Sequence, residues 1–326
     1  MSKKRPFVGV DLGGTSMMAV LASEKGKILG ASDCATIRDG GPEGVIDQIG
    51  GQIELAAKEA RVSPSRLGGI GVGAPGAVDP RRGLVVRAPN LGWSDVRLGP
   101  MLSARFGVPV VLGNDVQVAI QGEHAFGAAK GAERAVGIWV GTGVGGGVIV
   151  NGRLERGARG AAGEIGHICL DENGPECPCG RKGCAEAFSS RTSIERDVMK
   201  AVADGRKSVV PAIMKERNKT RMTSSVIQRA LAANDAVMQE VIARAQHYLG
   251  LLAGNLVNAL DPEVIVIGGG IAERLGEQFV APIREEARKR FLRPDPEGNV
   301  RIVHSELGDH AGALGASYLA RRAAER

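Results

Sequence analysis

Aromatic residues are scarce in this chain, which has only six Phe, two Tyr and two Trp among its 326 residues. Proteins that bind single-stranded nucleic acids stack bases on aromatic side chains, so this kind of binding has little material here. No apolar run approaches the roughly 20 residues that a membrane-spanning helix needs. The formal net charge of +6 is spread over separate basic patches, such as Lys3–Arg5 and Arg288–Arg290. The composition therefore predicts neither a nucleic-acid partner nor a membrane partner.

A secretory signal is also lacking, because the six residues that include Lys3, Lys4 and Arg5 lead directly into an apolar strand at Phe7. We therefore expect a cytoplasmic protein, whose thiols stay reduced. The cysteines are few and odd in number, five in all, and four of them lie between residues 169 and 184. In a reducing compartment this clustering favours a metal site. A disulfide pair and unrelated buried cysteines are the alternatives.

The cysteine-rich segment contains the ligand set of a tetrahedral zinc site. His167, Cys177, Cys179 and Cys184 offer one imidazole and three thiols within a short span. Glycines and a proline between them let the backbone turn tightly enough to converge on one ion. Cys169 is an alternative ligand, but its spacing fits less well. The segment therefore predicts structural Zn²⁺ bound by these four residues.

Two carboxylates, Glu164 and Glu186, flank the predicted zinc site. Sugars are recognised by groups that accept from or donate to several hydroxyls. His167 can bind zinc through one ring nitrogen and leave the other for a substrate hydroxyl. We therefore predict that the three residues form a polar sugar-binding wall. A metal site that only braces a loop is the alternative.

The second half of the chain repeats a pattern of the first. Residues 136–143 align with residues 8–15, and each segment continues into a second apolar strand with a short glycine-containing turn after it. A strand, a Gly/Thr turn and a hairpin that occur twice predict two related α/β halves around a cleft. Because glycine-rich hairpins are common, chance resemblance is the alternative.

The Gly/Thr turns of the two halves are suited to phosphate, because glycines free backbone amides to point at phosphate oxygens. Asp11 would repel phosphate directly, so its natural role is to hold hydrated Mg²⁺. If the Gly/Thr turn at 13–15 stood alone, a plain tight turn without a ligand would explain it. The Gly/Thr turns do not match a Walker loop. They do not match a dinucleotide-binding motif either, because residues 141–146 lead into a strand and not into a helix. The predicted phosphate contacts are Gly13, Gly14, Thr15, Gly141, Thr142 and Gly143.

Two further strand ends carry candidate functional residues. A glycine run, Gly268, Gly269 and Gly270, follows an apolar strand and precedes a helix. This position predicts that their amides contact a nucleoside or phosphate, and a turn without a ligand is the alternative. Asp115 ends another buried strand, where it can accept a proton from a substrate hydroxyl or cap the helix that begins near Val116. Phosphoryl transfer needs positioning, charge compensation and one such base.

Elsewhere the pattern is less specific. We expect Asn234 to cap a long helix that ends at Leu260, and a terminal helix over 311–324. Residues 205–225 are polar and poorly periodic, which predicts a surface excursion.

Together these motifs resemble the ROK family (repressor, open reading frame, kinase), within the actin-like ATPase and sugar kinase superfamily. The resemblance covers nearly the whole chain, and the cysteine-rich block is its most specific part. The matching segments are 11–15, 74–76, 89–93, 113–115, 141–143, 163–167, 177–186, 267–270 and 314–316.

The resemblance implies a two-domain ribonuclease-H-like (actin-like ATPase) α/β fold, with an interdomain cleft that binds sugar and ATP, and a zinc knuckle. We expect a smaller domain over 1–116 with a C-terminal helix at 311–326. We expect a larger one over 117–310 that carries the knuckle and a dimerisation surface. Members of the family commonly form homodimers, and a tetramer is the alternative. The implied zinc is structural, and Mg²⁺ accompanies ATP.

The resemblance also implies residue roles. Asp115 is similar to the family's general base, which deprotonates the sugar hydroxyl that attacks the γ-phosphate. The implied sugar contacts are Gly76, Asn90, Asn114, Asp115, Glu164, His167 and Glu186. The chain departs from many family kinases at Ser16, where they carry lysine directly after Gly-Gly-Thr. Polyphosphate therefore stays an alternative donor to ATP.

The implied activity is the ATP-dependent phosphorylation of a hexose, in the first place glucose to glucose 6-phosphate. Phosphorylation of N-acetylmannosamine or N-acetylglucosamine is the alternative within the class. A fructose kinase is not favoured, because the knuckle lacks a second histidine. A different class is a sugar-binding transcriptional regulator that lacks its DNA-binding domain, because only six residues precede the first strand. A third class is a sugar sensor without turnover.

Overall fold

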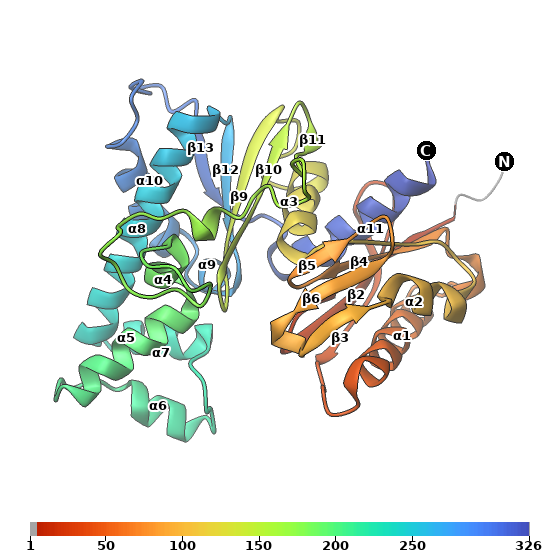
Figure 1. The fold of residues 1–326 in the computed structure, drawn as a ribbon, viewed down its shortest axis with the longest axis horizontal. Coiled ribbons are helices and arrows are strands. Elements are labelled where there is room, and N and C mark those ends of the chain that lie inside the picture. Colours follow the sequence, from red (N-terminus) through yellow and green to blue (C-terminus); the bar gives the residue numbers. More distant parts are fainter. Residues whose placement is uncertain (1–4, 326) are drawn as a thin grey trace. The chain divides into compact units, whose positions relative to one another are not determined.

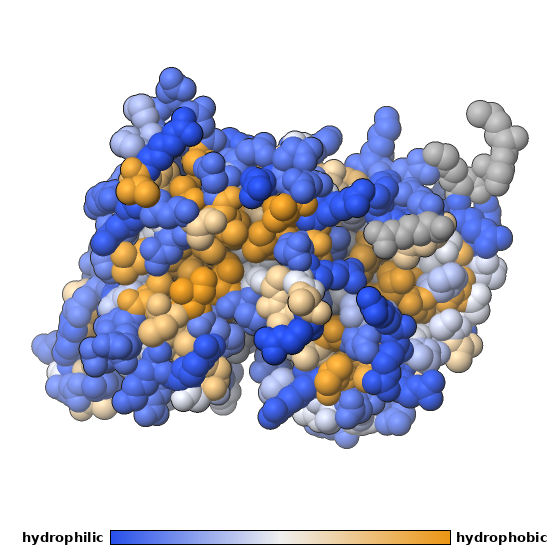
Figure 2. Space-filling view, turned by 45° about the horizontal axis from the view of Figure 1, so that its top comes forward, coloured by the Kyte–Doolittle hydropathy of each residue, from blue (hydrophilic) through white to orange (hydrophobic). Residues whose placement is uncertain are grey.

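The structure, a computed structural model, describes residues 5–325 and divides them into two compact units (Figure 1). The first unit runs to Gly131 and takes up the chain again from Asp309. The second unit spans Ala132–Gly308. None of the described helices is long and apolar enough to cross a bilayer. Hydrophilic residues make up most of the molecular face drawn in Figure 2, and hydrophobic residues show between them in patches.

The first unit is built on a five-stranded sheet in the order β3-β2-β1-β4-β8. The first three strands are antiparallel neighbours, whereas β4 runs parallel to β1 and β8 runs parallel to β4. The parallel strands are apolar because both of their faces are covered. The strand bounds are β1 (Phe7–Leu12), β2 (Ser16–Ala22), β3 (Ile28–Ala35), β4 (Gly69–Ala74) and β8 (Val110–Asn114).

Helices cover this sheet, and a small antiparallel sheet of order β5-β6-β7 completes the unit. Helix α1 places Val45, Ile49 and Ile53 four residues apart on one buried face, which packs toward β2 and β3. The remaining elements of this unit are α1 (Gly41–Glu59), η1 (Pro64–Arg66), β5 (Ala77–Asp79), β6 (Leu84–Ala88), η2 (Pro89–Leu91), β7 (Trp93–Val96), α2 (Leu98–Phe106), α3 (Asp115–Phe126) and α11 (Ala311–Ala324), with η4 (Gly308–His310) at the boundary.

The C-terminal helix α11 lies unusually close to the strands and to α3. A Cβ atom added to Gly71 of β4 would lie 1.9 Å from the Ala316 carbonyl oxygen, and one added to Gly315 would lie 1.7 Å from that of Val118 in α3. Only glycine leaves room for backbone at this distance. We expected 117–131 in the second domain, but the packing of α3 on α11 places these residues in the first unit.

The second unit contains a sheet with the same construction. Its order is β11-β10-β9-β12-β13, in which β10 is antiparallel to β9 and β11, while β12 runs parallel to both β9 and β13. The predicted internal repeat is therefore confirmed by strand order and direction. The strand bounds are β9 (Arg134–Val140), β10 (Val144–Val150), β11 (Arg153–Leu154), β12 (Val264–Gly268) and β13 (Arg301–His304).

The helices of the second unit differ from the expectation at two places. Helix α8 is capped by Asp235, whose carboxylate accepts from the Met238 amide, and not by Asn234, which takes a left-handed conformation just before it. The 205–225 segment, for which we expect a surface excursion, contains α6 and buries Met222. The bounds are η3 (Ile165–His167), α4 (Ala185–Ser189), α5 (Arg191–Ala203), α6 (Val210–Glu216), α7 (Ser224–Ala232), α8 (Ala236–Leu260), α9 (Gly270–Leu275) and α10 (Glu277–Arg288).

The close approach of α11 to β4 gives a stability prediction. Gly71→Ala would force a methyl group onto a backbone carbonyl, so we expect a loss of about 2–3 kcal/mol and a lower thermal midpoint. Gly51→Ala is the matched control, because its Cβ would meet nothing within 4 Å on α1, and alanine there should add up to about 1 kcal/mol. Equal thermal midpoints for the two variants would contradict this packing.

Candidate functional site

In the first unit, the parallel strands β1, β4 and β8 present polar residues at one edge of the sheet. Asp11 lies near the end of β1, Gly76 follows β4, and Asn114 ends β8. The carboxyl ends of parallel strands are where open α/β sheets bind their ligands. The structure therefore gathers at one edge residues that are more than 100 positions apart in sequence.

Asp11 is the electrostatic centre of this edge. Burial, together with the negative charges of Asp115 and Asp309, raises its pKa to about 7. Space for the carboxylate depends on Gly312 at the start of α11, where a Cβ would lie 2.4 Å from Asp11 Oδ2. Three neighbouring carboxylates repel one another, and a hard divalent cation with oxygen ligands relieves that repulsion. This donor set fits Mg²⁺.

The end of β8 shows which residue caps helix α3. The Asn114 Oδ1 atom accepts from the amides of Val116 and Gln117, both at 3.1 Å, so Asn114 is the N-cap. The Asp115 Oδ1 atom also accepts from the Val116 amide, at 2.9 Å, so Asp115 helps to satisfy the first turn of the helix. The Asn114 side-chain nitrogen donates to the Gly76 carbonyl at 3.2 Å. Asp115 is the first helical residue, in the turn where a negative charge is favoured.

The first Gly/Thr turn joins β1 to β2 and has Asn90 beside it. The Gly13 amide donates to the Ser16 carbonyl at 2.9 Å, and a Cβ added to Gly14 would lie 3.1 Å from Asn90 Cβ. The Arg38 guanidinium donates to the Asn90 carbonyl at 2.9 Å and holds that residue in place. The structure thus brings a predicted sugar contact next to a predicted phosphate turn.

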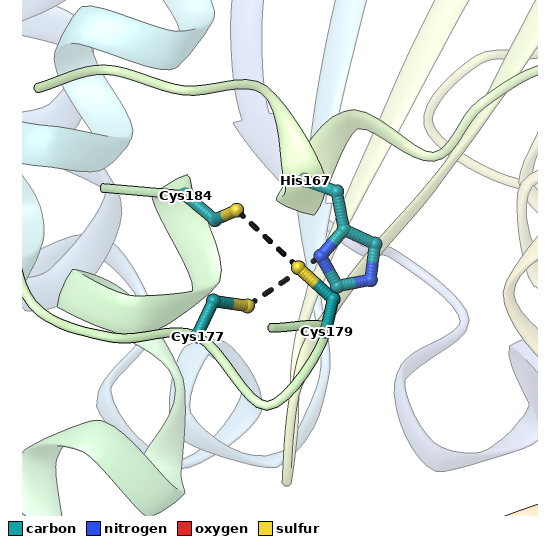
Figure 3. Close-up of side chains that lie close together, drawn as sticks. All are labelled: His167, Cys177, Cys179 and Cys184. Carbon is teal, nitrogen blue, oxygen red and sulfur yellow. Dashed lines mark hydrogen bonds between the residues drawn. The ribbon is translucent and has the colours of Figure 1, made fainter. Parts of the chain in front are cut away.

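In the second unit, the four predicted zinc ligands converge (Figure 3). Their ligand atoms all lie within 4.8 Å of one another. The Cys177 Sγ to His167 Nδ1 distance is 3.6 Å, and the Cys179 Sγ to Cys184 Sγ distance is 3.7 Å. Tetrahedral zinc, with bonds of about 2.3 Å to sulfur and 2.0 Å to nitrogen, places its ligand atoms about 3.5–3.8 Å apart. The cluster therefore fits zinc, and Cys169 is exposed outside it.

Tight turns form the zinc knuckle. The Cys177 amide donates to the Arg181 carbonyl at 2.7 Å, and Gly180 has a φ of +87°, which other residues rarely adopt. At Gly183 a Cβ would lie 1.6 Å from the Asp171 carbonyl oxygen. A hydrogen bond from the Arg181 backbone lowers the pKa of the Cys179 thiol to about 6. Burial raises the pKa of the Cys177 thiol to about 12 and also raises that of Cys184, so the local environment favours the thiolate only at Cys179.

Glu186, in the first turn of α4, connects the knuckle to the second Gly/Thr loop. Its Oε2 atom accepts from the Val144 amide at 2.9 Å, while Oε1 lies 3.7 Å from Cys177 Sγ, which can donate to it only as the protonated thiol. A Cβ at Gly143 would lie 2.3 Å from Glu186 Oε2, so the loop needs glycine at this position. Glu164 directly precedes η3 and is exposed, and within residues 5–325 no hydrogen bond joins its side chain to His167.

Loops 141–143 and 268–270 are neighbours in the second unit. Gly268 pairs with Trp139 across the parallel ladder, and a Cβ at Gly269 would lie 2.6 Å from the Val140 carbonyl oxygen. Gly269 has a φ of +89°. Both predicted phosphate loops therefore lie at the carboxyl edge of β9 and β12.

Two residues that sequence reasoning missed also lie at these edges. Asp309 joins the carboxylates around Asp11, although it is almost 300 positions away and belongs to no motif. Arg191 donates to the Thr142 hydroxyl at 2.7 Å. Its place five residues after the knuckle block at 177–186 could have drawn attention to it, but spacing alone does not show what it contacts.

The predicted sites divide between the units. Gly76, Asn90, Asn114 and Asp115 lie in the first unit, with the turn at 13–15. The knuckle, Glu164, Glu186 and the loops at 141–143 and 268–270 lie in the second.

Comparison with known proteins is consistent with this geometry. The model of the ROK family matches residues 7–323. A glucokinase from Halalkalibacterium halodurans is 34% identical over 319 residues, which are 98% of this chain and 96% of that protein. A xylose repressor from Caldicellulosiruptor bescii is 31% identical over 95% of this chain and 76% of its own length.

Among solved structures, a ROK family glucokinase from Streptomyces griseus, in complex with glucose and AMPPNP, matches with a TM-score of 0.83. It is 31% identical, and the match covers 97% of this chain and 99% of that one. The predicted two-domain α/β fold is confirmed by this likeness.

The raised pKa of Asp11 predicts how stability changes with pH. The folded state holds this proton up to about pH 7, whereas the unfolded chain releases it near 3.8, so the folded state loses stability as pH rises between these values. Without Mg²⁺, Asp11→Asn should therefore stabilise the protein by about 1–3 kcal/mol at pH 8 and little at pH 4. Urea unfolding at both pH values measures this. An equal gain from the exposed control Asp39→Asn, or none from Asp11→Asn, would contradict the buried carboxylate cluster.

Proposed function

The chain belongs to the ROK family, and from that membership we propose that it is a kinase that transfers the γ-phosphoryl group of ATP to a hexose. We propose glucose as the hexose, in a reaction that yields glucose 6-phosphate and ADP. The names of similar proteins that this chain matches over nearly its full length support this choice. We also propose that the protein is cytoplasmic, since reduced thiols held as metal ligands suit that compartment. We propose a homodimer as its assembly.

The observation that carries the proposal is the double contact of Glu186. One carboxylate oxygen accepts from the amide that follows the Gly141–Gly143 loop, and the other lies beside a zinc ligand. A sugar-binding wall and a phosphate loop are therefore held together by one side chain. A kinase needs this kind of fixed relation between acceptor and donor, because phosphoryl transfer depends chiefly on positioning.

In the proposed mechanism, Asp115 accepts the proton of the attacking sugar hydroxyl. The hydroxyl oxygen forms a bond to the γ-phosphorus as the bond to the β-phosphate oxygen breaks, and ADP leaves. Asp11, with Asp309 beside it, would hold Mg²⁺, which supplies charge neutralisation on the phosphates when it is bound. The glycine loops at 13–15, 141–143 and 268–270 would offer backbone amides to the phosphates and nucleoside.

We propose the same sugar contacts that the sequence suggests. The His167 Nδ1 atom lies 3.6 Å from Cys177 Sγ and would bind the zinc, which would leave Nε2 for a sugar hydroxyl. The zinc ion would fix the ring and the knuckle backbone and take no part in the chemistry. The complete set of proposed contacts is Gly76, Asn90, Asn114, Asp115, Glu164, His167 and Glu186.

A second candidate is a sugar-binding regulator without turnover, because xylose repressors match 95% of this chain. The carboxylate cluster of Asp11, Asp115 and Asp309 favours the kinase, since binding a neutral sugar does not require three mutually repelling carboxylates. An N-acetylhexosamine as acceptor and polyphosphate as donor are the variants within the kinase proposal.

The proposal is tested by ADP release from Mg-ATP with glucose, mannose, fructose, N-acetylglucosamine and N-acetylmannosamine. We expect turnover with glucose above the other sugars. Selective turnover of an N-acetyl sugar would replace the proposed acceptor and keep the kinase. Binding of a sugar without turnover, with either ATP or polyphosphate, would contradict the kinase and favour the regulator.

Asp115→Asn tests the proposed base in the same assay. The amide keeps the size of the side chain but cannot take the hydroxyl proton, so we expect kcat to fall about 10²- to 10⁴-fold with sugar affinity within about twofold of the original. The exposed control Asp39→Asn should leave both values unchanged. Near-normal kcat in Asp115→Asn would show that another group accepts the proton.

A further inference from the structure

The start of helix α5 is fastened to the loop at 141–143. The Arg191 amide donates to the Gly141 carbonyl at 2.9 Å, and the Thr192 hydroxyl donates to the Thr142 carbonyl at 2.9 Å. The Gly141 and Thr142 carbonyls are thereby occupied by α5, and the Gly143 carbonyl accepts from the Gly141 amide at 2.9 Å. Thr142 is exposed, so a ligand can reach it.

The Arg191 side chain adds a positive charge to this loop. Its Nη2 atom donates to the Thr142 hydroxyl at 2.7 Å. Within residues 5–325, no carboxylate oxygen is recorded within 4 Å of the Arg191 guanidinium, whereas Arg206 pairs with Glu240 and Arg221 pairs with Glu195. Arg191 is thus a cation whose one side-chain hydrogen bond goes to a neutral group.

Arg191 is also partly withdrawn from water. Burial lowers its pKa, Glu195 acts in the opposite direction, and the positive charge of Arg221 lowers it again. A desolvated guanidinium without a bound carboxylate costs free energy, which an anionic ligand would offset. The electrostatics of the site are therefore incomplete without a negatively charged partner.

The Thr142 hydroxyl can contribute a hydrogen bond to this anionic ligand. A hydroxyl has one proton to donate and accepts through its lone pairs. Because it accepts from Arg191, its own proton is available for a second partner, and the exposure of Thr142 lets a ligand be that partner. A guanidinium, a hydroxyl proton and glycine-loop amides together form a donor set that suits phosphate oxygens.

We propose that Arg191 binds the phosphate chain of the nucleotide donor, together with Thr142 and the amides of loop 141–143. This inference rests on the proposed kinase function and names a residue that the function alone does not assign. Arg191 belongs to the donor side of the reaction, so its contribution grows with the number of phosphates on the ligand and is independent of the sugar.

Direct binding measurements test the proposal without relying on turnover. Isothermal titration of wild type and Arg191→Gln with adenosine, ADP and AMPPNP, in Mg²⁺, should show ADP and AMPPNP weakened about 10- to 100-fold. Adenosine and glucose should bind within about twofold of wild type. Arg191→Lys should recover part of the loss, because it keeps the charge but not the fork of donors. The control Arg206→Gln removes an equal charge from an exposed pair and should change none of these affinities.

A double-mutant cycle with Thr142→Ala separates direct contact from positioning. If Arg191 touches phosphate, Arg191→Gln still weakens ADP binding in the Thr142→Ala background. No further loss in that background would overturn the proposal and make Arg191 a positioning residue that acts through Thr142. Circular-dichroism melting of each variant checks folding, and the conservative Arg191→Lys keeps the test valid if Arg191→Gln unfolds.

The outcomes also separate this inference from the proposed function. Wild-type turnover of a sugar, together with normal ADP affinity in Arg191→Gln, would reject the role of Arg191 and leave the kinase intact. Wild-type protein that binds sugar but neither ADP nor AMPPNP would reject both.

Discussion

The position of the Glu186 carboxylate holds the second unit's proposed site together. One oxygen accepts from the Val144 amide and the other lies 3.7 Å from Cys177 Sγ, so the metal cluster and the glycine loop meet at one side chain. This contact explains why position 143 is glycine, since any larger residue would displace the carboxylate. The proposed zinc would have a role without chemistry: it would fix Cys177 and the start of α4, which in turn position Glu186 and the loop.

The internal repeat supplies the two glycine turns but does not make the two halves equivalent. Both sheets have the same order and strand directions, and each places a Gly/Thr turn after its first strand. In the alignment of 8–15 with 136–143, however, Asp11 corresponds to Trp139. The carboxylate cluster therefore belongs to the first unit, and the zinc knuckle, inserted after β11, belongs to the second. In the proposed function, the first copy supplies the carboxylates for metal and base chemistry, and both copies supply phosphate and sugar contacts.

Local patterns in the sequence predicted the features that depend on neighbouring residues. The zinc ligands and the terminal helix over 311–324 follow from spacing and periodicity, and the structure has both. Features that depend on distant residues were missed: Asp309 reaches Asp11 only because α11 returns to β1. Asn234 and Asp235 are both good caps, and the choice between them depends on a left-handed Asn234 that no pattern shows. Helices α6 and α7 escaped notice because each is short and buries few apolar residues.

The coupling of metal to loop is tested most directly by amide hydrogen exchange at Val144, measured by NMR in zinc-loaded and chelator-treated protein. Metal analysis should first find about one zinc per chain. Removing it should speed exchange of the Val144 amide at least about tenfold, because its acceptor Glu186 loses its fixed position, while Val72 in the first unit keeps its rate. Unchanged protection of Val144 in protein shown to have lost its zinc would contradict the account.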